Sequence, residues 1–314
     1  MSATSAGDAL AEAHLLGLTR LDGQLLLGAV LHRPRSWLLA HDECSLDAGQ
    51  LTRFRALAMR RASGEPLAYL LGEKEFYGLS LSVNAAVLVP RPETETLVEW
   101  ALNLLRYGPI QPTVLDLGTG SGAIALALAH ASPQARVCGL DVSSSALAVA
   151  RTNARRLGLA VEWIQSDWWE ALAGRRFDLV VGNPPYICVA DPHLAALRYE
   201  PQIALVADSN GLGALRLLVE SATEHLTANG WLLLEHGHAQ APAVQSLLRQ
   251  HRYEEVSTRH DLAGHPRCSG GRATAASNNT TIEPASISPK TAPEASPGGE
   301  NSFKVKVNMP PLQP

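Results

Sequence analysis

Four consecutive residues, Asn183, Pro184, Pro185 and Tyr186, carry the groups that are needed to hold a flat amino group. The two prolines fix the backbone and have no N–H to donate, so their carbonyl oxygens remain available as acceptors. The Asn183 side chain adds an amide oxygen, and Tyr186 adds an aromatic face. Two acceptors can take the hydrogens of a planar –NH₂ group while the ring packs against its plane. The four residues therefore predict a catalytic site for a substrate that carries such a group.

A glycine-rich segment, Gly118, Thr119, Gly120, Ser121 and Gly122, follows the apolar run TVLDL. Alternating glycines let the backbone turn tightly and let a ligand approach it closely. Free N–H groups at the start of the next helix suit an anion. The spacing also fits the dinucleotide fingerprint, so the segment predicts a nucleotide-type cofactor, with NAD as one possibility.

Acidic and aromatic residues follow the next two predicted strands. Asp141 ends the second strand, where a carboxylate can accept two hydrogen bonds from a ribose. This position fits NAD and S-adenosylmethionine equally. Asp167 and Trp168 follow the third strand. There a carboxylate can accept from the amine of an adenine and an indole can pack on its ring, although simple packing is the alternative for Trp168.

The elements that must position these residues alternate between strand and helix from Thr113 onward. Such alternation predicts a parallel sheet covered by helices on both faces. Ligands of such a sheet bind at the carboxyl ends of the strands, near the topological switch point, which is where the motifs above fall. The predicted strands are TVLDL, ARVCGL, VEWIQ, FDLVVGN, WLLLE and RCSGGR, and the predicted helices cover residues 122–130, 144–157, 211–227 and 240–251.

The first part of the chain has a different pattern. Residues 8–75 are predicted to form short helices, with Asp22 and Asp47 as caps of two of them. Further on, FYGLSLSV and VLV flank residues 84–86, which predicts a hairpin that turns there. A run of arginines on the helix after Asp47 is interpreted as a solvated face, with a docking surface as the alternative. These are Arg53, Arg55, Arg60 and Arg61.

Composition excludes several classes of function. The chain has 314 residues and a net charge of −4, whereas proteins that bind nucleic acid through bulk electrostatics are normally basic. Its four isolated cysteines predict a reduced, cytoplasmic protein, and no signal peptide or membrane span is expected. His236 and His238 are spaced like a metal pair but lack a third ligand, so no metal is expected.

Several longer segments together resemble a known family. They are GEPLAYLLGEKEFYGLSLSVN, VLVPRPETE, VLDLGTGSGAIALALA, NPPYICVADPHL, YEPQIALVADSNGL and DLAGHPR. Over about residues 8–272 the chain resembles the bacterial release factor glutamine methyltransferases of the HemK or PrmC type. The resemblance implies an α/β fold: a Rossmann-like, seven-stranded methyltransferase sheet that uses S-adenosylmethionine, with a small helical N-terminal domain and a β-hairpin linker.

The expected domains follow from the resemblance and from composition. Residues 1–75 are expected to be a helical domain that docks the substrate, residues 76–92 the linker, and residues 93–272 the methyltransferase domain. Residues 273–314 are rich in Pro, Ser, Thr and Asn and are expected to form a disordered tail.

The resemblance also implies an activity and a role for each site residue. Enzymes of this family methylate the side-chain amide of the glutamine in the GGQ motif of class-1 peptide chain release factors, and they release S-adenosylhomocysteine. Gly118 to Gly122 would hold the methionine part of the cofactor and Asp141 its ribose. Trp168 would contact the cofactor, with Asp167 a weaker candidate. Asn183 to Tyr186 would hold the target glutamine, with Asn183 also bordering the cofactor.

Other functions remain possible at this point. Adenine carries a planar amine that NPPY fits, but methylation of nucleic acid would need base flipping and a basic recognition region. Methylation of a glutamine in a ribosomal protein is a second alternative, although RPETE is more similar to the release-factor branch. An NAD oxidoreductase leaves residues 183–186 unexplained, and a nucleotide-binding module without catalysis would not need Asp141, Asn183 and Tyr186 together.

Overall fold

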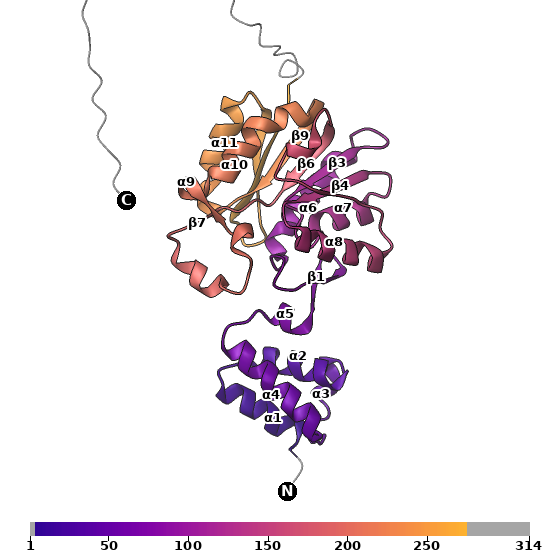
Figure 1. Cartoon of the computed structure of the whole chain (residues 1–314), viewed down its shortest axis with the longest axis vertical. Coiled ribbons are helices and arrows are strands. Elements are labelled where there is room, and N and C mark those ends of the chain that lie inside the picture. Colours follow the sequence, from indigo (N-terminus) through magenta and orange to yellow (C-terminus); the bar gives the residue numbers. More distant parts are fainter. Residues whose placement is uncertain (1–3, 275–314) are drawn as a thin grey trace, which may run out of the picture. The chain divides into compact units, whose positions relative to one another are not determined.

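The computed structural model describes residues 4–274, and Figure 1 shows a helical region followed by a larger α/β region. In the helical region, the buried faces of the helices share one apolar core that includes Leu26, Leu27 and Phe54. The small helical N-terminal domain expected from the sequence is therefore present. Its helices are α1 (Ala6–Leu15), α2 (Arg20–Leu31), α3 (Arg35–Leu38), α4 (Ala48–Ala62) and α5 (Leu67–Leu71).

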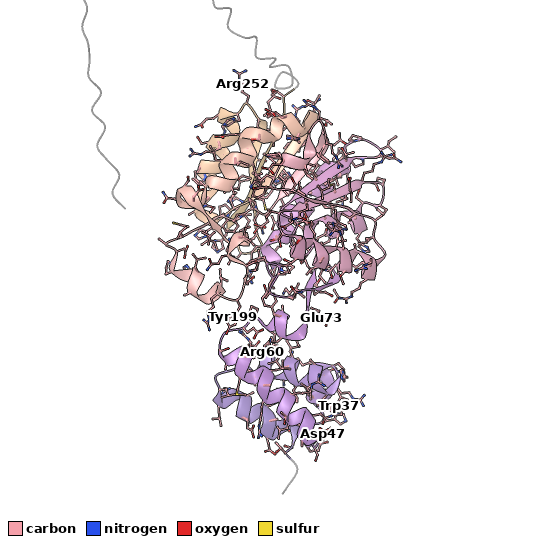
Figure 2. All side chains as sticks on the ribbon, viewed as in Figure 1. Trp37, Asp47, Arg60, Glu73, Tyr199 and Arg252 are labelled. Carbon is pink, nitrogen blue, oxygen red and sulfur yellow. The ribbon has the colours of Figure 1, made fainter. Side chains whose placement is uncertain are left out.

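One of the two predicted helix caps is correct and the other is wrong. Asp47 begins α4 in a capping box, in which its carboxylate accepts from the Gln50 N–H at 2.8 Å. Asp47 and Arg60 lie near opposite ends of this helix (Figure 2). Thr19, not Asp22, caps α2, and its hydroxyl accepts from the Asp22 N–H at 3.1 Å. Asp22 instead lies in the first turn, where a negative charge suits the helix dipole.

Most of the arginines on α4 pair with acidic residues of the same domain. Because these guanidinium groups are already paired within the domain, the pairs favour the solvated-face interpretation of the arginine run. Surface pairs of this kind contribute little to stability. The pairs are Arg55–Glu12 at 2.7 Å, Arg60–Glu65 at 2.6 Å and Arg61–Asp22 at 3.0 Å.

The hairpin that connects the two regions turns earlier than predicted. Its strands are β1 (Glu73–Phe76) and β2 (Leu79–Ser82), which pair antiparallel around Tyr77 and Gly78. Both turn residues have positive φ, 50° and 76°, as a two-residue hairpin turn of the primed type requires. The prediction that the hairpin turns at residues 84–86 was wrong, because the two paired strands meet at Tyr77 and Gly78, and Gly78 permits the tight turn.

The larger region is built on a seven-stranded sheet with the order β10-β11-β9-β6-β3-β4-β5. Six strands run in the same direction, and β11 alone is reversed, so that it pairs antiparallel with both β9 and β10. The chain goes from β3 to β4 and β5 on one side and then returns to β6 on the other, so the switch point lies between β3 and β6. The strands are β3 (Thr113–Leu117), β4 (Arg136–Asp141), β5 (Glu162–Gln165), β6 (Phe177–Gly182), β9 (Leu226–Glu235), β10 (Glu254–His260) and β11 (Pro266–Arg272).

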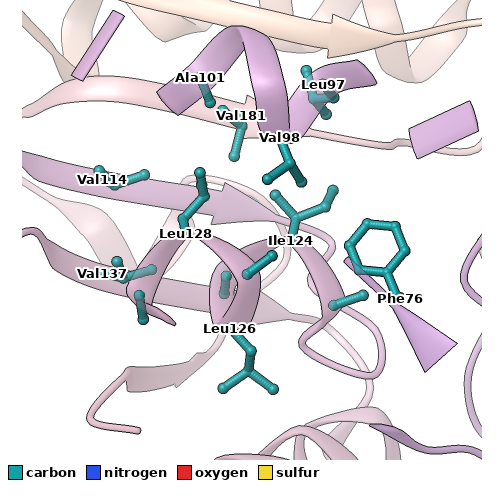
Figure 3. Close-up of a cluster of buried hydrophobic side chains, with 14 of the residues drawn as sticks. Phe76, Leu97, Val98, Ala101, Val114, Ile124, Leu126, Leu128, Val137 and Val181 are labelled. Carbon is teal, nitrogen blue, oxygen red and sulfur yellow. The ribbon is translucent and has the colours of Figure 1, made fainter. Parts of the chain in front are cut away.

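Helices cover both faces of this sheet (Figure 1). On one face, apolar side chains of α6 and α7 meet those of β3, β4 and β6, with Phe76 of the hairpin at the edge of the same cluster (Figure 3). On the other face, α10 and α11 pack on the sheet. In residues 4–274 no helix has the length and apolar character to cross a bilayer. The helices of this region are α6 (Glu95–Leu105), α7 (Ala123–Ala131), α8 (Ser144–Leu157), α9 (Asp208–Gly211), α10 (Gly213–Ser221) and α11 (Ala241–Gln250).

The folded region extends one residue past the predicted boundary at 272. Ala273 is buried, and its N–H donates to the Gly230 carbonyl at 2.8 Å, which continues the pairing of β11 with β9. Ala273 therefore belongs to the core and not to the predicted tail. The remainder of the predicted tail, from residue 275, lies outside the described residues.

We expect a chain that ends at Thr274 to keep the melting temperature and the methyl-transfer rate of the full chain, because the removed residues have too few apolar groups to join a core. A chain that ends at Arg272 is the control, since it additionally loses the buried Ala273 and should melt at a lower temperature. Differential scanning fluorimetry of the three chains makes the comparison. A large loss of stability in the chain ending at Thr274 would contradict the proposed boundary.

Candidate active site

One cavity of about 680 Å³ lies at the carboxyl ends of the central strands. Most residues singled out from the sequence line it, from four segments that follow or end β3, β4, β5 and β6. Gly122 and Tyr186 are not among the lining residues, and each lies beside one that is. The predicted residues in the lining are Gly118, Thr119, Gly120, Ser121, Asp141, Asp167, Trp168, Asn183, Pro184 and Pro185.

The glycine loop after β3 has the backbone conformation that only glycine adopts easily. Gly118, Gly120 and Gly122 all have positive φ, at 67°, 55° and 83°. A Cβ atom at Gly120 would meet nothing within 4 Å, so this part of the loop borders open space. A Cβ at Gly122 would meet the Trp163 ring at 3.0 Å, so that glycine serves packing. Two glycines therefore leave space beside the cavity, and the third lets the loop enter α7.

Two aspartates support this loop by accepting hydrogen bonds from it and from the residues next to it. Asp116 is fully buried, and its Oδ2 accepts from the Thr119 hydroxyl at 2.5 Å and from the Ala125 N–H at 3.2 Å. Burial raises the pKa of Asp116 to about 7. Asp141 accepts from the Gly120 N–H at 2.9 Å through one oxygen and from the Ser143 N–H at 2.9 Å through the other. Each oxygen of a carboxylate has a further lone pair, so Asp141 keeps acceptor capacity toward the cavity.

The turn after β5 holds its tryptophan in an uncommon conformation. Trp168 has φ 46°, and its carbonyl accepts from the Ser166 hydroxyl at 2.8 Å. The same hydroxyl accepts from the Ala171 N–H at 3.0 Å, which closes the turn. Trp168 lines the cavity, whereas Trp169 stacks on His225 with ring centroids 4.6 Å apart. Of the two indoles, only Trp168 is therefore available to a ligand.

The NPPY segment begins directly after β6, which ends at Gly182. Asn183 lines the cavity, and its Nδ2 donates to the Thr94 hydroxyl at 3.4 Å. At the other end of the segment, the Tyr186 carbonyl accepts from the Gln240 side chain at 3.1 Å. Burial raises the pKa of the Tyr186 phenol well above its usual range. The segment is thus held at both ends and stays uncharged at neutral pH.

Three functional candidates were missed in the sequence. Thr94 contacts Asn183, and Glu235, buried at the end of β9, lies beside this segment because Gly182 pairs with Leu234. Arg91 lines the cavity. The motif RPETE contains Arg91 and Thr94, but nothing in its sequence indicates a contact with the NPPY segment. An acid at the end of the apolar strand WLLLE was the available signal for Glu235.

An ion pair with a buried carboxylate fixes the wall of the cavity that contains Arg91. Glu200 is 5% exposed, and it accepts from the Arg91 guanidinium at 2.5 Å and from the Val89 N–H at 2.9 Å. This carboxylate therefore joins two segments that lie far apart in the sequence.

We expect Glu200→Ala to lower the free energy of unfolding by about 1–3 kcal/mol, because the Val89 N–H loses its partner inside the protein. Urea denaturation measures the change. The exposed pair partner Glu162→Ala is the control, since its bond to Arg175 lies on the surface and should matter by less than about 1 kcal/mol. Equal losses of unfolding free energy in the two variants would mean that Glu200 contributes no more to stability than a carboxylate in a surface pair.

The histidines with metal-like spacing do not converge on a site. His236 is fully buried, with its Nε2 2.8 Å from the Ser269 hydroxyl and its Nδ1 2.9 Å from the Gly237 carbonyl. Burial lowers its pKa. His238 instead faces His265, with ring centroids 5.8 Å apart. Within residues 4–274 no three His, Cys, Asp or Glu side chains are grouped as metal ligands.

Comparison with known proteins identifies both parts of the chain. Residues 97–197 match the family described as "Methyltransferase small domain", and residues 4–72 match the "PrmC N-terminal domain". The fold is also similar to the solved hMettl16 catalytic domain in complex with MAT2A 3'UTR hairpin 1. That likeness has a TM-score of 0.50 and 15% identity over 75% of this chain and 84% of the other, so it supports the fold alone. The fold and the site together define a methyltransferase that uses S-adenosylmethionine.

Two curated relatives are much more similar. The release factor glutamine methyltransferase of Bordetella pertussis is 50% identical over 258 residues, which are 81% of this chain and 95% of the relative. That of Xylella fastidiosa is 47% identical over 258 residues, 81% of this chain and 94% of the relative. The chain belongs to the release factor glutamine methyltransferase family.

Proposed function

We propose that this enzyme transfers a methyl group from S-adenosylmethionine to the side-chain nitrogen of the glutamine in the GGQ motif of class-1 peptide chain release factors. The observation that carries the proposal is that the glycine loop, Asp141 and the NPPY segment border a single cavity. A cofactor subsite and a subsite for a planar amide thus lie side by side. In cells this reaction would take place in the cytoplasm, where translation ends.

The cavity has the groups that S-adenosylmethionine requires. The space beside Gly120 suits the methionine part, the Asp141 carboxylate suits the ribose hydroxyls, and Trp168 offers a face to the adenine. When bound, the cofactor supplies a sulfonium methyl group that is already activated for transfer. The chemistry needs no metal, and we propose that the enzyme uses none.

The task of the protein is to orient the target amide. An amide nitrogen is a poor nucleophile because its lone pair is delocalised into the carbonyl. Acceptors on Asn183 and on the Pro184 carbonyl can bind both hydrogens of the target –NH₂. These bonds strengthen as positive charge develops on the nitrogen, so they favour the transition state over the ground state. Once the N–C bond has formed and the C–S bond has broken, the nitrogen loses one proton to water. The two prolines keep the acceptors rigid. Tyr186 borders the lining residue Pro185, and packing of its ring on the amide plane would need that ring to reach the cavity.

A direct test compares substrates in parallel. Purified release factor, a ribosomal protein and DNA are incubated with the enzyme and radiolabelled S-adenosylmethionine. We expect rapid labelling of the release factor only. Preferential labelling of the ribosomal protein or of DNA would replace the proposed function with one of the two alternatives considered from the sequence.

The helical N-terminal domain is proposed to dock the folded substrate. A free peptide that contains Gly-Gly-Gln offers the same amide but nothing for that domain to bind. We therefore expect kcat/KM for the peptide to be at least about a hundredfold lower than for the whole factor, as remote binding energy commonly contributes to positioning. Equal values for the peptide and the whole factor would rule out a docking role for the domain.

A further inference from the structure

One side chain outside the cavity links the end of the NPPY segment to another part of the cavity wall. Gln240 precedes α11, and its Nε2 donates to the Tyr186 carbonyl at 3.1 Å and to the Gly211 carbonyl at 3.3 Å. Its Oε1 accepts from the Gly237 N–H at 2.8 Å. These partners fix the orientation of the amide, because a flipped amide would place its oxygen against two carbonyl oxygens. Both hydrogens of the Gln240 amide therefore join two backbone segments.

The second of these segments, α9, has an uncommon backbone. Ser209, Asn210 and Gly211 have positive φ, at 50°, 58° and 82°. Two of the three are not glycine, so this conformation costs free energy and persists only where the surrounding structure holds it. Asp208 and Ser209 line the same cavity as the first three residues of the NPPY segment. A change in how α9 is held would therefore change the shape of the cavity.

The turn of α9 lies close against the backbone of the NPPY segment. A Cβ atom at Gly211 would overlap the Tyr186 carbonyl oxygen and would lie 2.8 Å from the Gln240 Nε2. The glycine is thus required for the close approach as well as for its positive φ. The Gln240 side chain holds the two segments at this short spacing.

The residues that follow the NPPY segment also pair with those that precede α9. The strand β7 (Ile187–Cys188) runs parallel to β8 (Val206–Ala207), and β7 lies beside α9 (Figure 1). The Ile187 N–H donates to the Leu205 carbonyl at 2.9 Å. A pairing of two residues on each strand is short, so the two bonds from Gln240 form a large part of the connection.

We propose that Gln240 is a positioning residue for methyl transfer: by joining the Tyr186 and Gly211 carbonyls it fixes the spacing between the NPPY segment and α9. The acceptors on Asn183 and Pro184 belong to the same segment, so a shift at its end changes where they lie. A misplacement of about 1 Å can slow a reaction about a hundredfold. The inference rests on the proposed function and extends the site to a residue that does not line the cavity.

The main test replaces Gln240 with Glu, which keeps the length of the side chain and the acceptor for the Gly237 N–H but has no N–H to donate. The two carbonyls cannot donate in its place, so both bonds are lost. We expect kcat for the release factor to fall about tenfold to a hundredfold, with KM and the affinity for S-adenosylhomocysteine within about twofold of wild type. Steady-state kinetics and titration calorimetry measure these values.

Gln245→Glu is the matched control on the same helix. The Gln245 Nε2 donates to the Thr258 hydroxyl at 2.7 Å, and a hydroxyl can donate to a carboxylate instead. This variant should keep the wild-type kcat. Three results would overturn the proposal: a full kcat in Gln240→Glu, equal losses in the two variants, or a loss of S-adenosylhomocysteine affinity that matches the loss of kcat.

Gly211→Ala tests the same spacing from the other side, because the added methyl group would force α9 away from the Tyr186 carbonyl. Gly174→Ala is its control, since Gly174 also has a positive φ, 73°, but a Cβ atom there would meet nothing within 4 Å. Both variants carry the strain of alanine at positive φ. Only Gly211→Ala should lower kcat, by at least about tenfold. Equal kcat values in the two variants would count against the proposal.

A last measurement does not depend on the substrate. Hydrogen–deuterium exchange, followed by mass spectrometry, reports how tightly β7, β8 and α9 are held. We expect peptides that cover residues 186–188 and 205–212 to exchange at least about threefold faster in Gln240→Glu than in Gln245→Glu. Equal exchange would overturn the role of Gln240 as a link. A wild-type enzyme that left release factors unmethylated would instead contradict the proposed function, and the exchange result would still stand.

Discussion

Replacing Asn183 with Ala is expected to slow methylation of the release factor about a hundredfold to a thousandfold, the usual effect of removing one group that stabilises developing charge. The affinity for S-adenosylhomocysteine should stay within a few-fold of wild type. The reason is that the proposed bond of Asn183 goes to the target amide and strengthens only as the nitrogen attacks. Single-turnover kinetics measure the rate, and titration calorimetry measures the affinity.

Two further variants make this result specific. Asn183→Asp keeps an acceptor but adds a charge, so its rate should fall between those of Asn183→Ala and wild type. Asn103→Ala removes an exposed asparagine on α6, outside the cavity, and should have no effect on the rate. Near-normal turnover of Asn183→Ala would mean that the NPPY segment does not bind the substrate amide through its asparagine.

Replacing Asp141 with Ala is expected to weaken S-adenosylhomocysteine binding by at least about tenfold, which corresponds to losing hydrogen bonds to a charged group. The structure adds a second reason to the loss of the ribose acceptor. Asp141 also accepts from the Gly120 and Ser143 N–H groups, so its removal frees the glycine loop from one of its supports.

The matched control is Asp167→Ala, since Asp167 also lines the cavity but is the weaker candidate for a cofactor contact. We expect it to change the affinity much less than Asp141→Ala does. Titration calorimetry with S-adenosylhomocysteine compares the two, and the melting temperature without ligand shows whether either variant is damaged. An unchanged affinity in Asp141→Ala would show that the ribose subsite lies elsewhere.

Much of the fold could be predicted from local patterns, because β3, β4 and β6 are short apolar runs: Gly118 follows β3, Asp141 ends β4 and Gly182 ends β6. The helix α8 was predicted at its observed bounds, since Ser143 and Gly158 mark its two ends. Strand β10 was not recognised, because its sequence EEVSTRH has few apolar residues and lies at the sheet edge. Its place depends on pairing with β11, which no local pattern shows.

The candidate site was predictable where one loop carries a complete motif. The glycine loop and the NPPY segment each follow a strand that ends at the same edge of the sheet, so their meeting was expected. Thr94 was not predictable, because it is a single polar residue in an otherwise ordinary turn. Its contact with Asn183 is a tertiary one that no local pattern shows.

The hairpin error has a similar physical origin. The residues at 84–86 are a turn, in which the Val87 N–H donates to the Asn84 carbonyl at 3.1 Å. A local turn signal was therefore present, but the following residues pair with no strand. Which of two turns closes a hairpin depends on the strands that flank it, and Tyr77-Gly78 lies between the two that pair.

The central claim is that a methyl group is transferred to one glutamine nitrogen of the release factor, and mass spectrometry of the product tests it most directly. Purified factor is incubated with the enzyme and S-adenosylmethionine that carries a deuterated methyl group, then digested and sequenced by fragmentation. We predict one labelled methyl on the side chain of the GGQ glutamine and none elsewhere, with no label when Asn183→Ala replaces wild type over the same short time. A label on another residue, or an unlabelled factor with active wild-type enzyme, would contradict the claim.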